Sequence, residues 1–149
     1  MEKNELTLSE KLRYDRQLKM PDFGLEKQLL LKNARVLLVG CGGLGSPISL
    51  YLAAAGVGTL GLIENDQIDL SNLQRQILYR TNEVGKDKLA QAVQVLKDLN
   101  SHIDIIPYSE RLTAQNAIEI IQNFDLVIDG SDNFPTRYLV NDACFLAKK

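Results

Sequence analysis

A glycine-rich segment that directly follows a run of apolar residues constrains the fold of this chain more than any other feature. The apolar run covers residues 34–39, and the segment at residues 40–45 reads GCGGLG. Glycines at such a position let the chain turn sharply from a strand into a helix, and they let backbone N–H groups come close to an anion. The amino end of the following helix adds a partial positive charge. We therefore predict a strand, a phosphate-binding turn and a helix, with Gly40, Gly42, Gly43 and Gly45 in the turn.

An acidic residue follows at the position where a nucleotide site needs one. Glu64 ends the next apolar run, about 20 residues after Gly45, which is where a carboxylate binds the ribose in nucleotide-binding βαβ units. A glycine pattern of this kind is weak by itself, since it also occurs as a plain tight turn. The strand before it and the acid after it favour a nucleotide as the ligand.

Four short apolar runs alternate with longer segments of helical period. The apolar runs cover residues 35–39, 59–64, 103–107 and 126–129. The helical segments cover residues 44–55, 86–100, 114–123 and 134–148, with Gly56 placed to end the first and Thr113 placed to cap the third. Continuous apolar runs are typical of strands that are covered on both faces. The pattern predicts an α/β fold with a Rossmann-like, doubly wound and mainly parallel sheet.

The two ends of the chain fall outside this alternation. Helical stretches near residues 9–19 and 25–31 precede the first strand, and we expect residues 1–32 to form an N-terminal helical arm on a single domain of 149 residues. The last helical segment has no strand after it, so we expect the C-terminal part of the fold to be missing. Part of the apolar face of that segment would then lack a partner, including Leu139, Val140 and Phe145.

Charge and hydropathy exclude several classes of protein. The net charge is -2, from 17 basic and 19 acidic residues, and no basic stripe indicates nucleic-acid binding. The apolar stretches are far shorter than the ~20 residues that span a bilayer, and the N-terminus is polar, so we expect a cytoplasmic protein without a membrane partner. Cys41 and Cys144 form no CxxC pair and predict neither zinc nor a disulfide, and His102, the only histidine, is expected at the surface.

A long polar connection, residues 65–85, leaves the carboxyl end of the second apolar run. Ligands of open α/β sheets bind at that edge, so Asn72 and Arg75 are placed to reach phosphates, although a solvated loop would contain the same residues. Lys86 and Lys88, which begin the next helical segment, could also reach phosphates or simply be solvated.

Two aspartates, Asp129 and Asp132, follow the fourth apolar run at the same edge of the sheet. One of them could hold Mg²⁺ together with substrate phosphates. The alternative is that Ser131, Asp132 or Asn133 only caps the last helix.

Two arginines, Arg13 and Arg16, are spaced three residues apart near the N-terminus, and this spacing puts both on one face of a helix. Such a pair is ordinarily a charged surface. The sharper hypothesis is an arginine finger that enters the phosphate site of another subunit.

Taken together, these elements resemble the MoeB/ThiF family of adenylyltransferases, also called HesA/MoeB/ThiF, which are relatives of the ubiquitin-activating enzymes. The elements that carry the resemblance are Arg13-Tyr14-x-Arg16-Gln17, Gly40-x-Gly42-Gly43-x-Gly45, Ser71-Asn72-Leu73-Gln74-Arg75-Gln76, Lys88 and Ser131-Asp132-Asn133. The resemblance covers the N-terminal part of that family's fold and essentially all of this chain. It implies a ThiF-type, ATP-binding adenylation domain over residues 1–149. The implied reaction uses ATP and Mg²⁺ to adenylate the C-terminal Gly-Gly carboxylate of a ubiquitin-like sulfur-carrier protein, for molybdopterin or thiamine biosynthesis.

The resemblance also implies roles for individual residues. Gly43 would lie against the nucleotide, Glu64 would hold the ribose, Asn72, Arg75 and Lys88 would contact the phosphates, Asp132 would bind the Mg²⁺ ion, and Arg16 would reach across a homodimer into the neighbour's ATP site. The family usually has aspartate at the ribose position, so Glu64 is one methylene longer. The family's two zinc-binding CxxC pairs, its sulfur-transfer cysteine and its groove for the carrier's tail have no counterpart in this sequence.

Two other functions remain open at this stage. An NAD-dependent oxidoreductase would explain the glycine turn and Glu64, but it leaves Asn72, Arg75 and Asp132 without a role, and no hydride-transfer residue can be named. A non-catalytic nucleotide-binding module is the third possibility.

Overall fold

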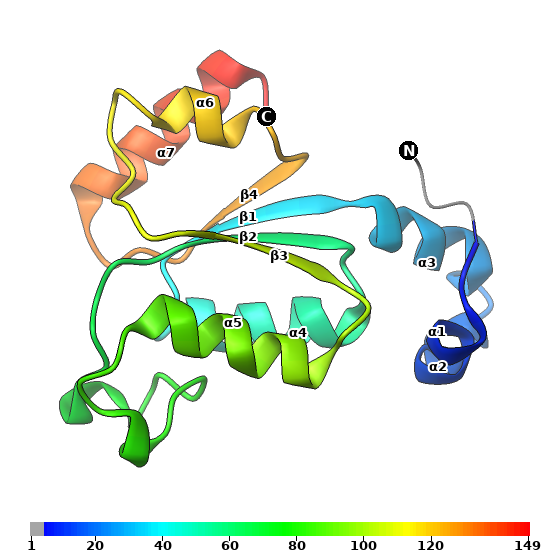
Figure 1. The fold of residues 1–149 in the computed structure, drawn as a ribbon. Coiled ribbons are helices and arrows are strands. Elements are labelled where there is room, and N and C mark those ends of the chain that lie inside the picture. The colour runs from blue at the N-terminus through cyan, green and yellow to red at the C-terminus, as the bar shows by residue number, and fades with distance from the viewer. Residues whose placement is uncertain (1–4) are drawn as a thin grey trace.

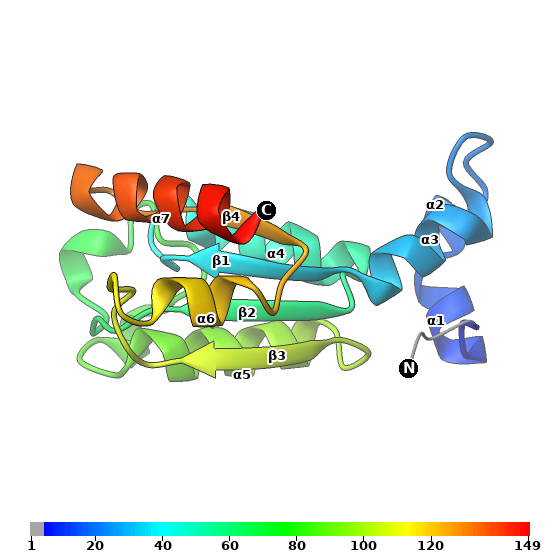
Figure 2. The same cartoon turned by 90° about the horizontal axis from the view of Figure 1, so that it is seen from above.

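Four parallel strands in the order β3-β2-β1-β4 form the centre of the structure. The structure is a computed structural model and describes residues 5–149. The strands are β1 (Arg35–Val39), β2 (Thr59–Ile63), β3 (Asp104–Tyr108) and β4 (Leu126–Asp129). The central strand β1 pairs in parallel with both β2 and β4, and β2 pairs in parallel with β3. The predicted parallel, doubly wound α/β sheet is confirmed, as Figures 1 and 2 show.

The register brings the carboxyl ends of three strands to one edge of the sheet. Val39, the last residue of β1, lies opposite Ile63 of β2 and Asp129 of β4. The segments that leave these strands therefore start side by side. This alignment places the glycine turn, Glu64 and the segment around Asp132 at the same edge.

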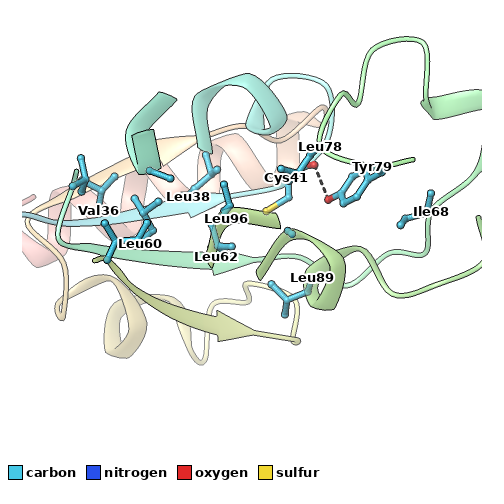
Figure 3. Close-up of a cluster of buried hydrophobic side chains, with 14 residues drawn as sticks. Val36, Leu38, Cys41, Leu60, Leu62, Ile68, Leu78, Tyr79, Leu89 and Leu96 are labelled. Carbon is cyan, nitrogen blue, oxygen red and sulfur yellow. Dashed lines mark hydrogen bonds between the residues drawn. The ribbon is translucent and has the colours of Figure 1, made fainter. Parts of the chain in front are cut away.

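Helices cover both faces of the sheet. Side chains alternate between the two faces along each strand, so every strand presents apolar side chains to the helices on both sides. On one face, α4 (Gly45–Ala55) and α5 (Lys88–Leu99) cover a core that includes Leu38 and Leu62 (Figure 3). On the other face lie α6 (Ala117–Ile121) and α7 (Phe134–Ala147), over a core that includes Leu37, Ile63 and Phe124. Each predicted apolar run thus contributes to two cores.

Several predicted boundaries shift by one to three residues. The second strand ends at Ile63, which leaves Glu64 at the start of the connection, and the third strand starts and ends one residue later than predicted. Helix α5 begins at Lys88 rather than at residue 86, because the Asp87 side chain caps it by accepting a hydrogen bond from Ala90 N at 2.7 Å. Gly56 ends α4 as predicted.

The predicted cap at Thr113 is wrong. Helix α6 begins at Ala117, three residues later than predicted, and Asn116 is its N-cap residue. The Thr113 backbone N–H instead donates to Asn116 Oδ1 at 2.7 Å. This bond holds residues 113–116 in a turn before the helix.

The N-terminal segment contains three helices where two were predicted: α1 (Leu8–Arg13), α2 (Asp15–Leu18) and α3 (Gly24–Asn33). The break falls at Tyr14, which is buried and whose hydroxyl accepts a hydrogen bond from Asn100 Nδ2 at 2.9 Å. The prediction that Arg13 and Arg16 share one face of a continuous helix is therefore wrong. The three helices lie beside the amino ends of the strands (Figure 2). Residues 1–4 of the expected arm lie outside the described residues.

The apolar face of α7 was expected to lack a partner, and this is correct for only part of the helix. Val140 is buried and Leu139 packs partly against the same core, so the prediction is wrong for these two residues. Phe145 is 81% exposed, as predicted. Along the part of the chain that the structure describes, no helix has the length and apolarity needed to cross a membrane.

Candidate active site

The carboxyl ends of β1, β2 and β4 open into a cleft with a volume of about 1090 Å³. Most of the predicted site residues line it, namely Gly40, Gly42, Gly43, Glu64, Arg75, Lys88 and Asp132. The sequence separates these residues by up to 92 positions, so the parallel sheet is what brings them together. Gly45, Asn72 and Arg16 do not line the cleft.

The glycine turn is shaped by two close backbone approaches. Gly40 has a φ of 88°, and a Cβ atom there would lie 3.1 Å from the carbonyl oxygen of Gly130. A Cβ atom on Gly45 would collide with the carbonyl oxygen of Gly40. Among the described residues, no group accepts a hydrogen bond from the amides of Gly42 and Gly43, and both lie just before the amino end of α4. This arrangement is the kind of backbone cradle that holds anions in other proteins.

Glu64 joins the glycine turn to the start of the long connection. Its Oε2 accepts a hydrogen bond from Cys41 N at 3.0 Å, and its Oε1 accepts from Asn65 N at 2.8 Å and from Asp66 N at 3.0 Å. The residue is 8% exposed and lines the cleft. Both carboxylate oxygens thus have backbone partners, and one lone pair of Oε2 remains available to a further donor.

Lys88 belongs to a polar network at the wall of the cleft. The side chain is almost fully buried, and its Nζ lies 3.3 Å from Asn72 Oδ1 and 3.5 Å from Asp66 Oδ2. Gln76 Nε2 also donates to Asn72 Oδ1, at 3.2 Å. For Lys88 and Asn72, the structure favours this network over a solvated surface. Lys86 is exposed and does not line the cleft.

The long connection is held in place by buried contacts at several points. Tyr79 donates its hydroxyl proton to the Cys41 carbonyl oxygen at 2.9 Å, and Ile68 and Leu78 belong to the same core cluster as Leu38 and Leu62 (Figure 3). Burial raises the pKa of Tyr79, which keeps the hydroxyl protonated as a donor. Asp69 caps the short helix η1 (Leu70–Asn72) through its hydrogen bonds to Ser71, and these bonds lower the pKa of Asp69. These contacts position the segment that carries Arg75.

Arg75 lies across the glycine turn. A Cβ atom on Gly43 would be 3.3 Å from the Cδ atom of Arg75, so the absence of a side chain at Gly43 lets the arginine stem pack there. The guanidinium Nη1 donates to Ser71 O at 3.4 Å, and the residue is otherwise exposed to the cleft. The Arg75 stem thus packs on Gly43, and its cationic group lies beside the glycine turn.

Three polar residues at the end of β4 and just after it make different contacts. Asp129 Oδ1 accepts a hydrogen bond from Ser131 N at 2.8 Å, and Asn133 caps α7 by accepting from Thr136 N at 3.0 Å. Asp132 stays exposed on the cleft, with Asn133 Nδ2 3.5 Å from its Oδ1. The helix-cap alternative is therefore correct for Asn133, and the Asp132 carboxylate remains available to a ligand.

The donor set fits Mg²⁺ and does not fit zinc. Magnesium uses one or two carboxylates and takes its other ligands from phosphates and water, which a single Asp132 can satisfy. Within residues 5–149, no group of three or more His, Cys, Asp or Glu side chains could hold a metal ion. Burial raises the pKa of Cys41 and also that of Cys144, which is less buried. Neither thiol therefore loses its proton easily to become a metal ligand.

The N-terminal arginines lie far from this cleft. Arg13 Nη1 donates to Leu99 O at 3.0 Å, which ties α1 to the end of α5. Arg16 is exposed on α2, and the helices α1–α3 lie at the opposite ends of the strands from the cleft (Figure 2). Arg16 does not reach the cleft of its own chain. His102 is partly exposed, and its Nε2 lies 3.0 Å from Ser9 Oγ of α1, again outside the cleft.

The lining residues that were not predicted as site residues include Gln76, Arg111, Ser131 and Arg137. Gln76 belongs to the same segment as Arg75, and this was the only signal for it. Arg137 donates through Nη2 to Ser131 O at 3.1 Å, and its guanidinium carbon lies 5.8 Å from the ring centre of Phe134. No pattern in the sequence indicated these contacts, because they depend on how α7 starts.

Comparison with known proteins gives a family match over most of the chain. A sequence model described as the ThiF family matches residues 14–149. The relative named adenylyltransferase and sulfurtransferase MOCS3, from Xenopus laevis, is 49% identical over 149 residues, which are 100% of this chain and 33% of the relative. The relative named adenylyltransferase and sulfurtransferase uba4, from Aspergillus terreus, is 53% identical over 137 residues, which are 92% of this chain and 28% of the relative. The chain thus spans about a third of the length of the curated relatives it matches.

Solved structures give the same fold. The E. coli tRNA N6-threonylcarbamoyladenosine dehydratase TcdA, in complex with AMP, superposes with a TM-score of 0.90 over 97% of this chain and 58% of its own, at 23% identity. E. coli MccB with ATP superposes with a TM-score of 0.75 over 82% of this chain and 36% of its own, at 34% identity. The first similarity concerns the fold alone.

Proposed function

The chain belongs to the ThiF family, and from this premise we propose that residues 1–149 are the ATP-binding part of an adenylyltransferase, with residues 1–32 as an N-terminal arm. The observation that carries the proposal is the convergence of the glycine turn, Arg75, Lys88 and Asp132 on one cleft. The names of the relatives from Xenopus laevis and Aspergillus terreus also support an adenylyltransferase. The family match favours ATP over the NAD-dependent oxidoreductase considered above.

The proposed reaction joins a carboxylate to AMP. A carboxylate oxygen attacks the α-phosphorus of ATP, the bond from that phosphorus to the bridging oxygen breaks, and pyrophosphate leaves with its electron pair. The products are an acyl-adenylate and pyrophosphate. We propose that the carboxylate is the C-terminal Gly-Gly end of a ubiquitin-like sulfur-carrier protein of molybdopterin or thiamine biosynthesis, since the two relatives are named sulfurtransferases as well.

Electrostatics explain why this cleft suits the reaction. Attack of one anion on another requires fixed cations and an in-line arrangement, and Arg75 and Lys88 supply two cations beside the cradle. A carboxylate is already ionised near pH 7, so no general base is needed. This fits a cleft whose lining contains no histidine among the described residues.

The predicted site residues in and beside the cleft have separate proposed roles. The amides of Gly42 and Gly43 hold a phosphate at the amino end of α4, while Arg75 and Lys88 neutralise the phosphate chain. Asn72 acts through Lys88, because its Oδ1 orients the ammonium group. Glu64 accepts a ribose hydroxyl. Asp132 would hold Mg²⁺, which when bound neutralises phosphate charge and favours departure of pyrophosphate.

We further propose that the active form is a homodimer in which Arg16 enters the neighbour's cleft. Arg16 is exposed and lies at the end of the molecule away from its own cleft, so a role at a phosphate site requires a second copy. The fork of donors on arginine suits a phosphate.

ATP–pyrophosphate exchange tests the proposed function. The assay would use the complete gene product with a carrier protein that ends in Gly-Gly, and the matched control would be the same carrier without its last glycine. Exchange that requires the intact tail and Mg²⁺ is the expected result. Two results would contradict adenylation of such a carrier. One is exchange that does not depend on any carrier, and the other is no exchange although ATP still binds.

A further inference from the structure

Two buried polar atoms in the described residues lack a hydrogen-bond partner, Gln76 Oε1 and Ser131 Oγ. Both residues line the cleft, and they lie on different segments beside the glycine turn. A buried oxygen without a partner costs free energy, so folded proteins retain few of them. Their occurrence at this one cleft indicates that a ligand supplies the missing partners.

The network around Gln76 fixes which way its amide faces. Lys88 Nζ can only donate hydrogen bonds, so Asn72 must present its Oδ1 to it, at 3.3 Å. Gln76 meets the same Oδ1 at 3.2 Å and must therefore present its NH₂ group. Its Oε1 is left as an acceptor without a donor. The residue is 5% exposed, and its Nε2 lies 3.5 Å from where a Cβ atom on Gly42 would be.

We propose that Gln76 is a nucleotide-binding residue whose Oε1 accepts a hydrogen bond from the bound nucleotide complex. This inference rests on the proposed function, because it takes ATP as the ligand. Phosphate oxygens at neutral pH are acceptors, so they cannot satisfy Oε1. ATP and its cation offer three kinds of donor, which are a ribose hydroxyl, the adenine amino group and a water molecule bound to the cation that accompanies the phosphates.

Gln76→Met should lower the ATP affinity while it leaves the stability nearly unchanged. It removes the unsatisfied oxygen, which stabilises the ligand-free chain, and it gives up the hydrogen bond from Nε2 to Asn72 Oδ1, which keeps Lys88 as a partner. Each change is worth about 1 kcal/mol, so the ligand-free chain should unfold at nearly the same temperature. ATP affinity, measured by isothermal titration calorimetry, should fall about tenfold, which is the size of one hydrogen bond to a ligand. Gln74→Met is the matched control, because Gln74 is an exposed residue of the same segment, and it should change neither quantity.

Further titrations identify the donor. If a ribose hydroxyl is the donor, the difference between wild type and Gln76→Met should vanish with 2′-deoxy-ATP or with 3′-deoxy-ATP. If a cation-bound water is the donor, the difference should vanish when Mg²⁺ is removed by EDTA. If the adenine amino group is the donor, the difference should vanish with purine riboside triphosphate, which lacks that group. A difference that persists under all of these conditions would contradict the acceptor role.

Other outcomes separate this proposal from the proposed function. Unchanged ATP affinity in Gln76→Met, or a clear loss of stability of the ligand-free variant, would mean that Gln76 is only structural. That result would leave adenylation itself intact, since wild-type pyrophosphate exchange is measured separately. Failure of the wild-type chain to bind ATP would contradict both proposals.

Discussion

The backbone N–H of Cys41 donates a hydrogen bond to Glu64 Oε2 at 3.0 Å, and this bond joins the glycine turn after β1 to the end of β2. The second carboxylate oxygen accepts from two amides of the long connection. One side chain therefore holds together the two segments that border the cleft. A carboxylate is required for this, because both of its oxygens act as acceptors.

Glu64→Gln should weaken both the fold and the nucleotide site. A glutamine amide has one acceptor oxygen, and its NH₂ group would face a backbone N–H donor. We expect a loss of about 1–3 kcal/mol in the free energy of unfolding and at least a tenfold loss of ATP affinity. Urea denaturation and calorimetry measure these two quantities. Glu119→Gln, at an exposed position of α6, is the control. Wild-type values in Glu64→Gln would show that its hydrogen bonds do not shape the site.

The buried pair between Lys32 and Glu10 should make the stability of the N-terminal helices depend on pH. Their charged atoms lie 2.7 Å apart, and the side chains are 11% and 4% exposed. Burial raises the pKa of Glu10, but its hydrogen bonds with Lys32 and Thr7 outweigh burial and hold the pKa below its ordinary value of 4.5. The stabilisation is therefore present above the unfolded-state pKa, and it is lost as the pH falls through the lower folded-state pKa.

Lys32→Met tests this pair, because it leaves the buried carboxylate without its partner. The expected loss is about 3–5 kcal/mol at neutral pH, and it should shrink in acid, where Glu10 becomes protonated. Denaturation curves at several pH values measure it. Lys27→Met removes an exposed pair and should cost at most about 1 kcal/mol. A loss that is constant with pH would contradict the account.

Gly56 should be intolerant of a side chain because of Tyr14. Gly56 has a φ of 89°, and a Cβ atom there would lie 2.5 Å from the ring of Tyr14. Gly85 has a φ of 84° but open space around it, so Gly85→Ala isolates the backbone strain of about 1–2 kcal/mol. Gly56→Ala should cost about 1–3 kcal/mol more, since it also overpacks the contact. Thermal unfolding of the two variants compares them, and equal losses would rule out the Tyr14 contact as the cause.

Complementation between mutants should reveal whether Arg16 acts across a dimer. Arg16→Ala and Arg75→Ala should each inactivate the homodimer in pyrophosphate exchange. In a mixed dimer, the subunit with Arg16→Ala keeps an intact cleft and receives Arg16 from its neighbour. An equal mixture should therefore recover about a quarter of wild-type activity, because half of the dimers are mixed and each has one working site. Continued inactivity in confirmed mixed dimers would argue against an arginine in trans.

The sheet was predictable because its strands are covered on both faces, which makes β1 and β2 nearly continuous apolar runs. The break at Tyr14 was not predictable, because the residue that holds it is Asn100, 86 positions away. The sequence also could not decide among Ser131, Asp132 and Asn133 as the cap of α7, since all three residue types cap helices well. Gln76 was missed because only its contacts with Asn72 and the glycine turn reveal its role.

A crystal structure of the chain with ATP and Mg²⁺ tests the central claim most directly. The account predicts phosphates at the amides of Gly42 and Gly43, with the guanidinium of Arg75 and the Nζ atom of Lys88 within hydrogen-bond distance of them and the Asp132 carboxylate on the metal ion. A nucleotide bound outside this cleft, or one whose phosphates face away from Arg75 and Lys88, would contradict it.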